Sequence, residues 1–379
     1  MRRNMLKLLV LALLTTIGIS CKKDKLNQGR IAQENYGVVK VFYATDRQPV
    51  SLNASLKFYG GERSENEQLA MGVCEISIPR LHQTAKLERP SILKLEFSED
   101  PNKHIVLLGA VQQSYENFYG EMHSSISSSL SKEAFVFIHG YKVSFEDAAL
   151  RTAQLAYDLR RTGADAEYDI TPILYSWPSK GELASYGADE DTVIWTTVHL
   201  RWFLEDVAAK SGATRIHLIA HSMGNRALTN ALNMIATEAR STSMPHFQQV
   251  VLTAPDIGMR NFKQLADAIQ RPADKVTLYA SSDDEPLKAS KKFHEEQRAG
   301  DSGKNLVVIR GIDSIDVSSV GGCLLCFERL DLDRWLGHSY YANNPSVISD
   351  LKLLLKEGKP PGQRTKLVQH ARGYWQFKP

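Results

Sequence analysis

The spacing of hydrophobic positions along the chain changes at about residue 130. Before that point, residues 38–47, 72–80 and 104–113 mix β-branched and aromatic residues with polar ones, which predicts strands. The serine-rich residues 124–132 predict a loop or short linker. From Ser131 onward, short apolar runs alternate with segments whose apolar residues recur at helical spacing. We therefore expect an α/β fold in which a mostly parallel central sheet carries helices on both faces and a β-rich N-terminal extension.

The predicted elements of this second region follow one another in a regular series. Strands are expected at residues 134–140, 170–178, 215–220, 249–256, 275–284 and 305–313, and helices at 144–161, 189–210, 222–240, 261–269 and 344–358. Ser144 is a suitable N-cap for the first helix. The organisation expected from these patterns is a β-rich part at 37–130, a core at 131–357 and an extended tail at 358–379.

The N-terminus has the pattern of a targeting segment. Arg2, Arg3 and Lys7 precede an apolar run that ends at Ser20-Cys21, which predicts a signal peptide at residues 1–20. "GISC" resembles a bacterial lipobox, so we expect a lipid on Cys21, a tether at 21–36 and attachment to the membrane through that anchor. An ordinary signal peptide or an uncleaved anchor is the alternative.

The predicted lipid anchor leads to an expected location in the bacterial cell envelope. Lys22 follows the cysteine where an aspartate would favour the inner membrane, so the outer membrane is expected.

Composition narrows the classes of function. The 379 residues are 43% hydrophobic, enough for one large domain or two small ones. The net charge is only +3 and acidic and basic residues are interspersed, which argues against a nucleic-acid partner. Cys323 and Cys326 form a C-x-x-C without a second pair or a histidine pair to complete a zinc site, so we assign them no chemistry. No metal or organic cofactor is implied.

The segment "RIHLIAHSMGN", residues 215–225, is the most informative part of the sequence. A predicted strand ends directly before Ser222, and a predicted helix follows it. Ala220 and Gly224 stand two residues before and after this serine, as a sharp strand-to-helix turn requires. The pattern predicts a nucleophile elbow that presents the Ser222 hydroxyl at a helix N-terminus. An ordinary serine N-cap is the alternative.

A serine nucleophile requires hydrogen-bond donors for the developing oxyanion. The segment "FIHGY" ends an earlier strand, and Gly140 allows the backbone to pass close to the serine. We expect the backbone N–H groups of Tyr141 and Met223 to be the donors. His139 and His221 belong to these two turns and are expected to shape them.

The nucleophile also requires a base and an acid that orients the base. Asp284 follows the predicted strand at 275–284 and is the favoured acid, with Asp256 and then Asp283 as alternatives. His338, before the last helix, is the expected base. The remaining candidates are less suitable as bases: His221 lies within the elbow, His217 in a strand and His370 in the tail.

Several segments together resemble one known family. "VFYATDR", "FVFIHGYKVSFEDAA", "YSWPS", "HLIAHSMGNRAL", "APDI", "TLYASSDDEPL" and "GHSYY" occur in the order found in the bacterial α/β-hydrolases called DUF900. The resemblance runs from about residue 37 to 355 and implies an α/β-hydrolase fold with esterase or lipase-like activity. It also implies that Ser222, Asp284 and His338 form the triad. Lys142 departs from the family, which usually has asparagine after "HGY".

These observations favour a serine hydrolase that cleaves a small-molecule carboxylic ester through an acyl-enzyme. A thioesterase, peptidase or acyltransferase could use the same triad, and a catalytically inactive, lipid-anchored binding protein is a further alternative. Asp46 and Arg47 are expected to form a structural ion pair, with substrate binding as the alternative. Trp177 is expected either to pack above the strand ends or to line the substrate pocket.

Overall fold

The computed structural model describes residues 35–50, 58–91, 95–161, 168–237, 244–321 and 338–378. The expected signal peptide, the lipidation site at Cys21 and nearly all of the tether lie outside the described residues, as do Cys323 and Cys326. Within the described ranges, no helix combines the length and the apolar character needed to cross a membrane.

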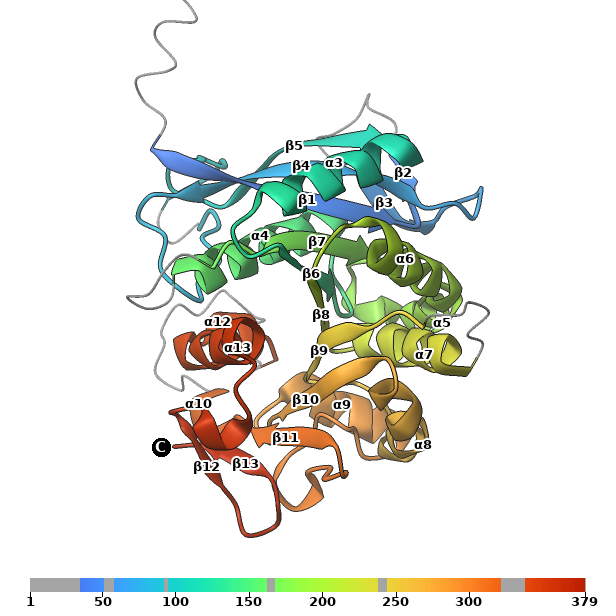
Figure 1. Ribbon diagram of the computed structural model, residues 1–379, viewed down its shortest axis with the longest axis vertical. Helices are drawn as coiled ribbons and strands as arrows, with labels where there is room; N and C mark the ends of the chain where they lie inside the picture. Colours follow the sequence, from blue (N-terminus) through green and yellow to red (C-terminus); the bar gives the residue numbers. More distant parts are fainter. Residues whose placement is uncertain are drawn as a thin grey trace, which may run out of the picture.

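One large sheet contains most strands of the described residues. Its strands are β1 (Tyr36–Thr45), β4 (Ala70–Pro79), β5 (Val106–Gln113), β6 (Glu133–Ile138), β7 (Thr171–Ser176), β8 (Arg215–His221), β9 (Phe247–Thr253), β10 (Ala273–Ala280), β11 (Ile312–Asp316), β12 (Leu367–Gln369) and β13 (Trp375–Phe377). Their order across the sheet is β12-β13-β11-β10-β9-β8-β6-β7-β1-β4-β5 (Figure 1). A separate two-stranded sheet joins β2 (Arg47–Pro49) to β3 (Tyr59–Arg63).

The centre of the large sheet is parallel. β6 pairs in parallel with both β7 and β8, and the parallel pairing continues through β9 and β10 to β11. β1 pairs in parallel with β7 on one side and antiparallel with β4 on the other, and β4 pairs antiparallel with β5. The N-terminal strands therefore extend the central sheet directly.

Helices cover both faces of the sheet. They are α3 (Tyr115–Ser128), α4 (Phe145–Arg161), α5 (Tyr186–Trp195), α6 (Thr197–Lys210), α7 (Gly224–Thr237), α8 (Met259–Gln270), α9 (Glu285–His294), α10 (Ser318–Gly321), α12 (Tyr340–Asn343) and α13 (Pro345–Glu357). Short 3₁₀ turns stand at Leu183–Ser185, Gly303–Asn305 and Pro361–Gln363. The predicted α/β architecture, with a mostly parallel sheet between helices, is confirmed.

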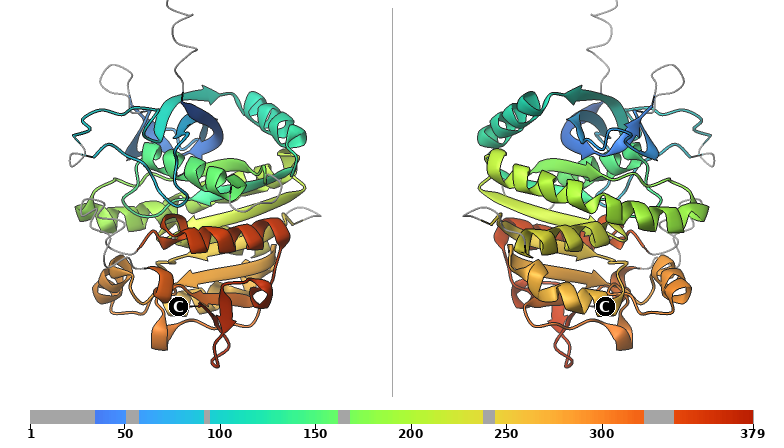
Figure 2. Two further views of the ribbon diagram at one scale, coloured as in Figure 1. Left: turned by 90° about the vertical axis from the view of Figure 1, so that its left-hand side faces the viewer. Right: turned by 90° about the vertical axis from the view of Figure 1, so that its right-hand side faces the viewer.

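Alternating side chains of each central strand enter two different cores. On β6, Val136 and Ile138 belong to the core beneath α3, α6, α7 and α8, whereas Phe135 and Phe137 belong to the core beneath α4, α12 and α13. All four side chains are buried, as expected for a strand covered on both faces. In Figure 2, the left-hand view looks onto the face with α4 and α13, and the right-hand view looks onto the opposite face.

The serine-rich loop predicted before the core is wrong in its first half, because α3 continues to Ser128. The Ser114 side chain caps this helix by accepting a hydrogen bond from the Asn117 N–H, 3.3 Å away. Phe118, Met122 and Ile126 are fully buried on one side of the helix. Burial of this apolar face outweighs the low helix propensity of the serines.

Two predictions near the C-terminus also require correction. The strand expected at 305–313 begins only at Ile312, directly after Gly311, whose φ of 86° interrupts an extended chain. The tail expected to be extended forms a hairpin, in which β12 pairs with β13 and β13 pairs in parallel with β11. The short hairpin therefore continues the sheet beyond β11.

Candidate active site

Ser222 lies in the tight turn between β8 and α7, in a strained backbone conformation. Its φ of 50° falls in the left-handed region, which residues with a side chain rarely adopt. The Ser222 N–H donates to the Thr253 carbonyl at 3.0 Å, and the Ser222 carbonyl accepts from the N–H groups of Asn225 at 3.1 Å and Asp256 at 3.2 Å. These bonds to the end of β9 and the start of α7 hold the turn in this conformation, which is compatible with a nucleophile elbow.

Two glycines bring the loop after β6 into contact with this turn. A Cβ atom on Gly224 would lie 2.2 Å from the His139 carbonyl oxygen, and one on Gly140 would lie 2.8 Å from Cβ of Ser222. Neither approach is compatible with a larger residue. Of the predicted oxyanion donors, Tyr141 directly follows Gly140 and Met223 lies between Ser222 and Gly224.

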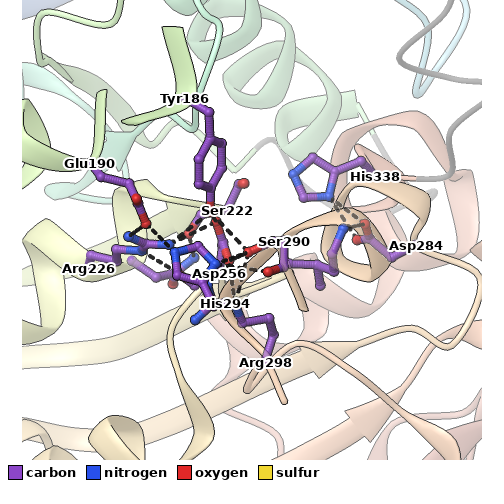
Figure 3. Close-up of polar contacts among 12 residues, drawn as sticks. Tyr186, Glu190, Ser222, Arg226, Asp256, Asp284, Ser290, His294, Arg298 and His338 are labelled. Atoms are coloured by element: carbon purple, nitrogen blue, oxygen red, sulfur yellow. Dashed lines mark hydrogen bonds and ion pairs between the residues drawn. The ribbon is translucent and has the colours of Figure 1, made fainter. Parts of the chain in front are cut away.

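His338 and Asp284 are hydrogen-bonded to each other. Nδ1 of His338 lies 2.8 Å from both carboxylate oxygens of Asp284. Asp284 is fixed in turn as the N-cap of α9, because its Oδ1 accepts from the Leu287 N–H at 3.0 Å. Burial raises the pKa of Asp284, although His338 acts in the opposite direction. In Figure 3 the imidazole of His338 lies between Asp284 and Ser222.

His221 supports the segment that carries His338. Its ring centroid is 4.6 Å from that of His338, and its Nε2 lies 3.1 Å from the His338 carbonyl oxygen. Burial lowers the pKa of His221 well below its ordinary value, and the proximity of His338 adds to this effect. A neutral His221 whose Nε2–H donates to that carbonyl fits these contacts.

The two alternative acids have other surroundings. Asp283 is exposed. Asp256 is buried and accepts hydrogen bonds from the hydroxyls of Tyr186 and Ser290, both at 2.6 Å. Burial alone would raise its pKa, but Arg226 and Arg298 outweigh it and hold the pKa below its usual value. The Asp256 carboxylate thus joins helices α5, α7 and α9 beside the elbow (Figure 3).

This network around Asp256 is the main feature of the site that the sequence did not reveal. Arg226 pairs with both Asp256 and Glu190, and His294 also contacts Glu190 at 2.6 Å. Its members come from three helices, α5, α7 and α9, and from the segments after β9 and α9, and they form no sequence motif. The available signals were Asp256, which the sequence suggested only as an alternative acid, and Arg226, which lies one helical turn after the serine.

The histidines rejected as bases have other partners. Nε2 of His217 lies 3.2 Å from Glu133 across neighbouring strands, and His370 stacks on Tyr374 in the C-terminal hairpin. His139 is buried and stacks on Trp177, with ring centroids 5.1 Å apart. Burial lowers the pKa of His139 well below its ordinary value, and Arg47 adds to this effect. Trp177, fully buried, donates from Nε1 to the His139 carbonyl at 2.7 Å, so it packs beneath the loop.

The expected ion pair between Asp46 and Arg47 is wrong. Asp46 bonds with Tyr175, Thr196 and His199. Arg47 donates to the carbonyl of Val143 at 2.7 Å and contacts Nε2 of His139 at 3.2 Å. Neighbouring residues of an extended chain point in opposite directions, which explains why the two side chains bond to different groups. Arg47 thus helps to hold the loop next to Ser222.

Ser222 and His338 face one cavity of about 930 Å³. This volume is in the range of small-molecule sites. Apolar and aromatic side chains form much of its wall, among them Leu87, Phe137, Tyr141, Val143, Tyr186, Leu287, Phe293 and Tyr341. In the described ranges, no group of three or more His, Cys, Asp or Glu side chains is arranged to hold a metal ion.

Comparison with known families finds one match over most of the chain. The model described as "Alpha/beta hydrolase of unknown function (DUF900)" matches residues 115–356. The uncharacterised protein alr1448 of Nostoc sp. is 27% identical over 134 residues, which are 29% of this chain and 34% of that protein. The chain thus matches about a third of this curated relative.

The solved structures found by comparison have only low similarity to this chain. A predicted CIB-like hydrolase from Thermoplasma acidophilum is 13% identical, with a TM-score of 0.33, over 61% of this chain and 89% of its own. An esterase B from Lactobacillus rhamnosis, inhibited by a tributyrin phosphonate, is 9% identical, with a TM-score of 0.33, over 88% of this chain and 90% of its own. Similarity at this level carries no argument about the function of this chain.

Proposed function

Because the chain belongs to the α/β-hydrolase family of unknown function DUF900, we propose that it is a serine hydrolase that cleaves carboxylic esters through an acyl-enzyme on Ser222. The observation that carries the proposal is the hydrogen-bonded pair of His338 and Asp284, which lies at the same cavity as the strained turn of Ser222. A buried carboxylate that holds Nδ1–H of an imidazole leaves Nε2 able to accept a proton.

In the proposed reaction, the Ser222 hydroxyl attacks the carbonyl carbon of the ester while His338 takes its proton. His338 then returns the proton to the leaving alcohol as the C–O bond breaks, and the acyl group stays on Ser222. A water molecule attacks this acyl-enzyme in the same way, which releases the carboxylic acid and restores the serine. Asp284 orients the imidazole and stabilises its protonated form.

The oxyanion of each tetrahedral intermediate would be held by the backbone N–H groups of Tyr141 and Met223. The close approaches at Gly140 and Gly224 support this assignment, because they bring both loops against the serine. Arg47 and Trp177 hold the first loop from beneath, so its N–H groups are positioned before substrate binds.

Substitution of the nucleophile tests the mechanism. Ser222→Ala should abolish turnover of short p-nitrophenyl esters and covalent labelling by a fluorophosphonate, which requires an activated serine. Ser339→Ala is the matched control, because Ser339 lines the same cavity next to His338. Undiminished turnover in the Ser222 variant would exclude the mechanism, and an unlabelled wild-type protein would favour a binding role.

We also propose that the mature protein is held in the bacterial cell envelope by a lipid on Cys21, at the outer membrane. The "GISC" motif supports this proposal. Labelled palmitate should be incorporated into the wild-type chain and not into Cys21→Ser, and the variant should leave the membrane fraction. If Cys21→Ser incorporated as much label as the wild type, the lipid would be attached to another residue.

A further inference from the structure

The charged side chains that line the cavity are not balanced. Each acidic side chain that lines the cavity pairs with a basic side chain that does not line it. The pairs are Asp147 with Arg89, Asp256 with Arg226 and Arg298, and Glu285 with Lys288. Arg89 is shared with Glu99 and Glu146, so Asp147 is only partly neutralised. The feature of the wall that matters here is that the side chains of Lys142 and Arg151, which also line the cavity, have no carboxylate partner among the described residues.

Arg151 is held in place without being neutralised. Its Nη1 donates to Oε1 of Gln154 at 2.7 Å and to Oδ1 of Asn343 at 2.8 Å, and both acceptors are uncharged amides. Gln154 is fully buried and is fixed in turn by hydrogen bonds to Asp158 and to the Ala342 carbonyl. The amides thus fix the guanidinium while its full charge remains available.

The edge of Arg151 formed by Nε and Nη2 has the geometry to bind an oxyanion. Among the described residues, no acceptor takes a hydrogen bond from either nitrogen. Two parallel N–H groups on one edge of a guanidinium match the two oxygens of a carboxylate or phosphate. Arg151 is half-buried and lines the cavity.

Arg151 is also near the proposed catalytic groups. It lies on α4, which directly follows the loop that carries Tyr141, and its partner Asn343 lies in α12, which directly follows His338 and Ser339. The positive charge of Arg151 contributes to the low pKa of His221, although burial is the largest cause. Lys142, on the loop itself, adds a second cation at the cavity wall.

We propose that the substrates are esters that carry an anionic group, a carboxylate or a phosphate, and that Arg151 binds this group while Ser222 attacks the ester carbonyl. The proposal rests on the proposed hydrolase function and specifies its substrate class. The apolar wall accommodates the chain between the two ends of the substrate, and the cation selects for the charged end.

A pair of esters that differ in one group tests the proposal. Mono-p-nitrophenyl adipate ends in a carboxylate, and the p-nitrophenyl ester of adipamic acid ends in a carboxamide of the same size. The wild-type protein should favour the carboxylate in kcat/KM by roughly 10- to 100-fold, mainly through KM, as expected for a charge-assisted bond. A third ester of equal length that ends in a phosphonate shows whether the site prefers a carboxylate or a phosphate-like group. A preference for either anion over the carboxamide supports the proposal.

Substitution of Arg151 tests whether this residue binds the anionic group of the substrate. Arg151→Gln should reduce the ratio of the two kcat/KM values to near one, and Arg151→Lys should keep part of it. Arg160→Gln is the matched control, because Arg160 lies on the same helix but outside this cavity and pairs with Asp169. A wild-type protein without the preference, or a preference that survives in Arg151→Gln, overturns the proposal.

Failure of the hydrolase function would be distinguishable from failure of the anion site. If the wild-type protein turns over neither ester, the hydrolase function has failed, and the intact esters then serve as ligands in calorimetry. Tighter binding of the carboxylate by the wild type than by Arg151→Gln would still support the anion site. Equal binding would overturn it.

Discussion

Replacement of Gly224 by alanine provides a direct test of the elbow geometry. The added Cβ would lie 2.2 Å from the His139 carbonyl oxygen and 2.9 Å from that of Ile138. Both neighbours are backbone atoms at the end of a central strand, so neither can rotate away. The two loops must separate by about 0.8 Å to reach the shortest approach that real Cβ atoms show.

This separation should affect activity more than stability. Overpacking of a rigid site costs about 1–3 kcal/mol of unfolding free energy, which a folded protein of this size can tolerate. A displacement of about 1 Å between nucleophile and oxyanion donors costs on the order of 100-fold in rate. We therefore expect Gly224→Ala to lose about 100-fold in kcat for a p-nitrophenyl ester while remaining folded at 25 °C.

The matched control is Gly120→Ala in α3, where a Cβ would meet nothing within 4 Å. Alanine favours the helix, so this variant should gain about 0.5–1 kcal/mol in urea unfolding with unchanged kcat. The close packing of the two loops would be wrong if Gly224→Ala kept kcat within twofold of the wild type and its free energy of unfolding within about 0.5 kcal/mol.

The other predictions concern buried charges and histidines. Asp256→Asn should cost about 3–5 kcal/mol in urea unfolding, because the buried Arg298 loses its carboxylate partner and the half-buried Arg226 keeps only Glu190. Asp284→Asn should instead lower kcat about 10⁴-fold. Similar unfolding losses in the two variants would contradict the separate roles. Burial lowers the pKa of His82, but hydrogen bonds to Asp158 and Glu88 outweigh it and raise the pKa to about 9. The contribution of His82 to the free energy of unfolding should therefore be full below pH about 6.5 and lost towards pH 9. In urea unfolding, His82→Gln should cost on the order of 2–3 kcal/mol at pH 6 and much less at pH 9.5. The pH dependence of stability due to His221 has the opposite sign, because its pKa is lowered in the folded protein. Below pH about 6.5 the unfolded chain takes up a proton at this histidine and the folded chain does not, so the free energy of unfolding falls by up to ~1.4 kcal/mol per pH unit on acidification. His221→Gln should flatten this slope.

Much of the fold and of the candidate site could be predicted because the signals are local. The elbow depends on a strand, a serine and two small residues within eleven positions. Asp284 and His338 follow strands or precede helices whose patterns are clear, and parallel strands bring their carboxyl ends to one edge of the sheet. These local patterns were enough to select Ser222 and His338, which line one cavity, and Asp284, which is hydrogen-bonded to His338.

The remaining features depend on contacts between distant segments. The pairing of β1 with β7 joins Phe42 to Ile173, and no local pattern specifies such a partner. Helix α3 was missed because its stability comes from burial of Phe118 and Met122 against other elements. The amides around Arg151 come from residues 154 and 343, so only the folded chain reveals that its charge is unpaired.

The order of the site residues along the chain has a consequence for synthesis. A nascent polypeptide that has emerged from the ribosome as far as α9 already contains the nucleophilic hydroxyl and the acidic partner. It still lacks the imidazole at position 338 and the turn that presents it. On the proposed mechanism, such a partial product cannot attack lipids or metabolites that it meets, and hydrolytic capacity arises only when the last segments dock onto the finished sheet.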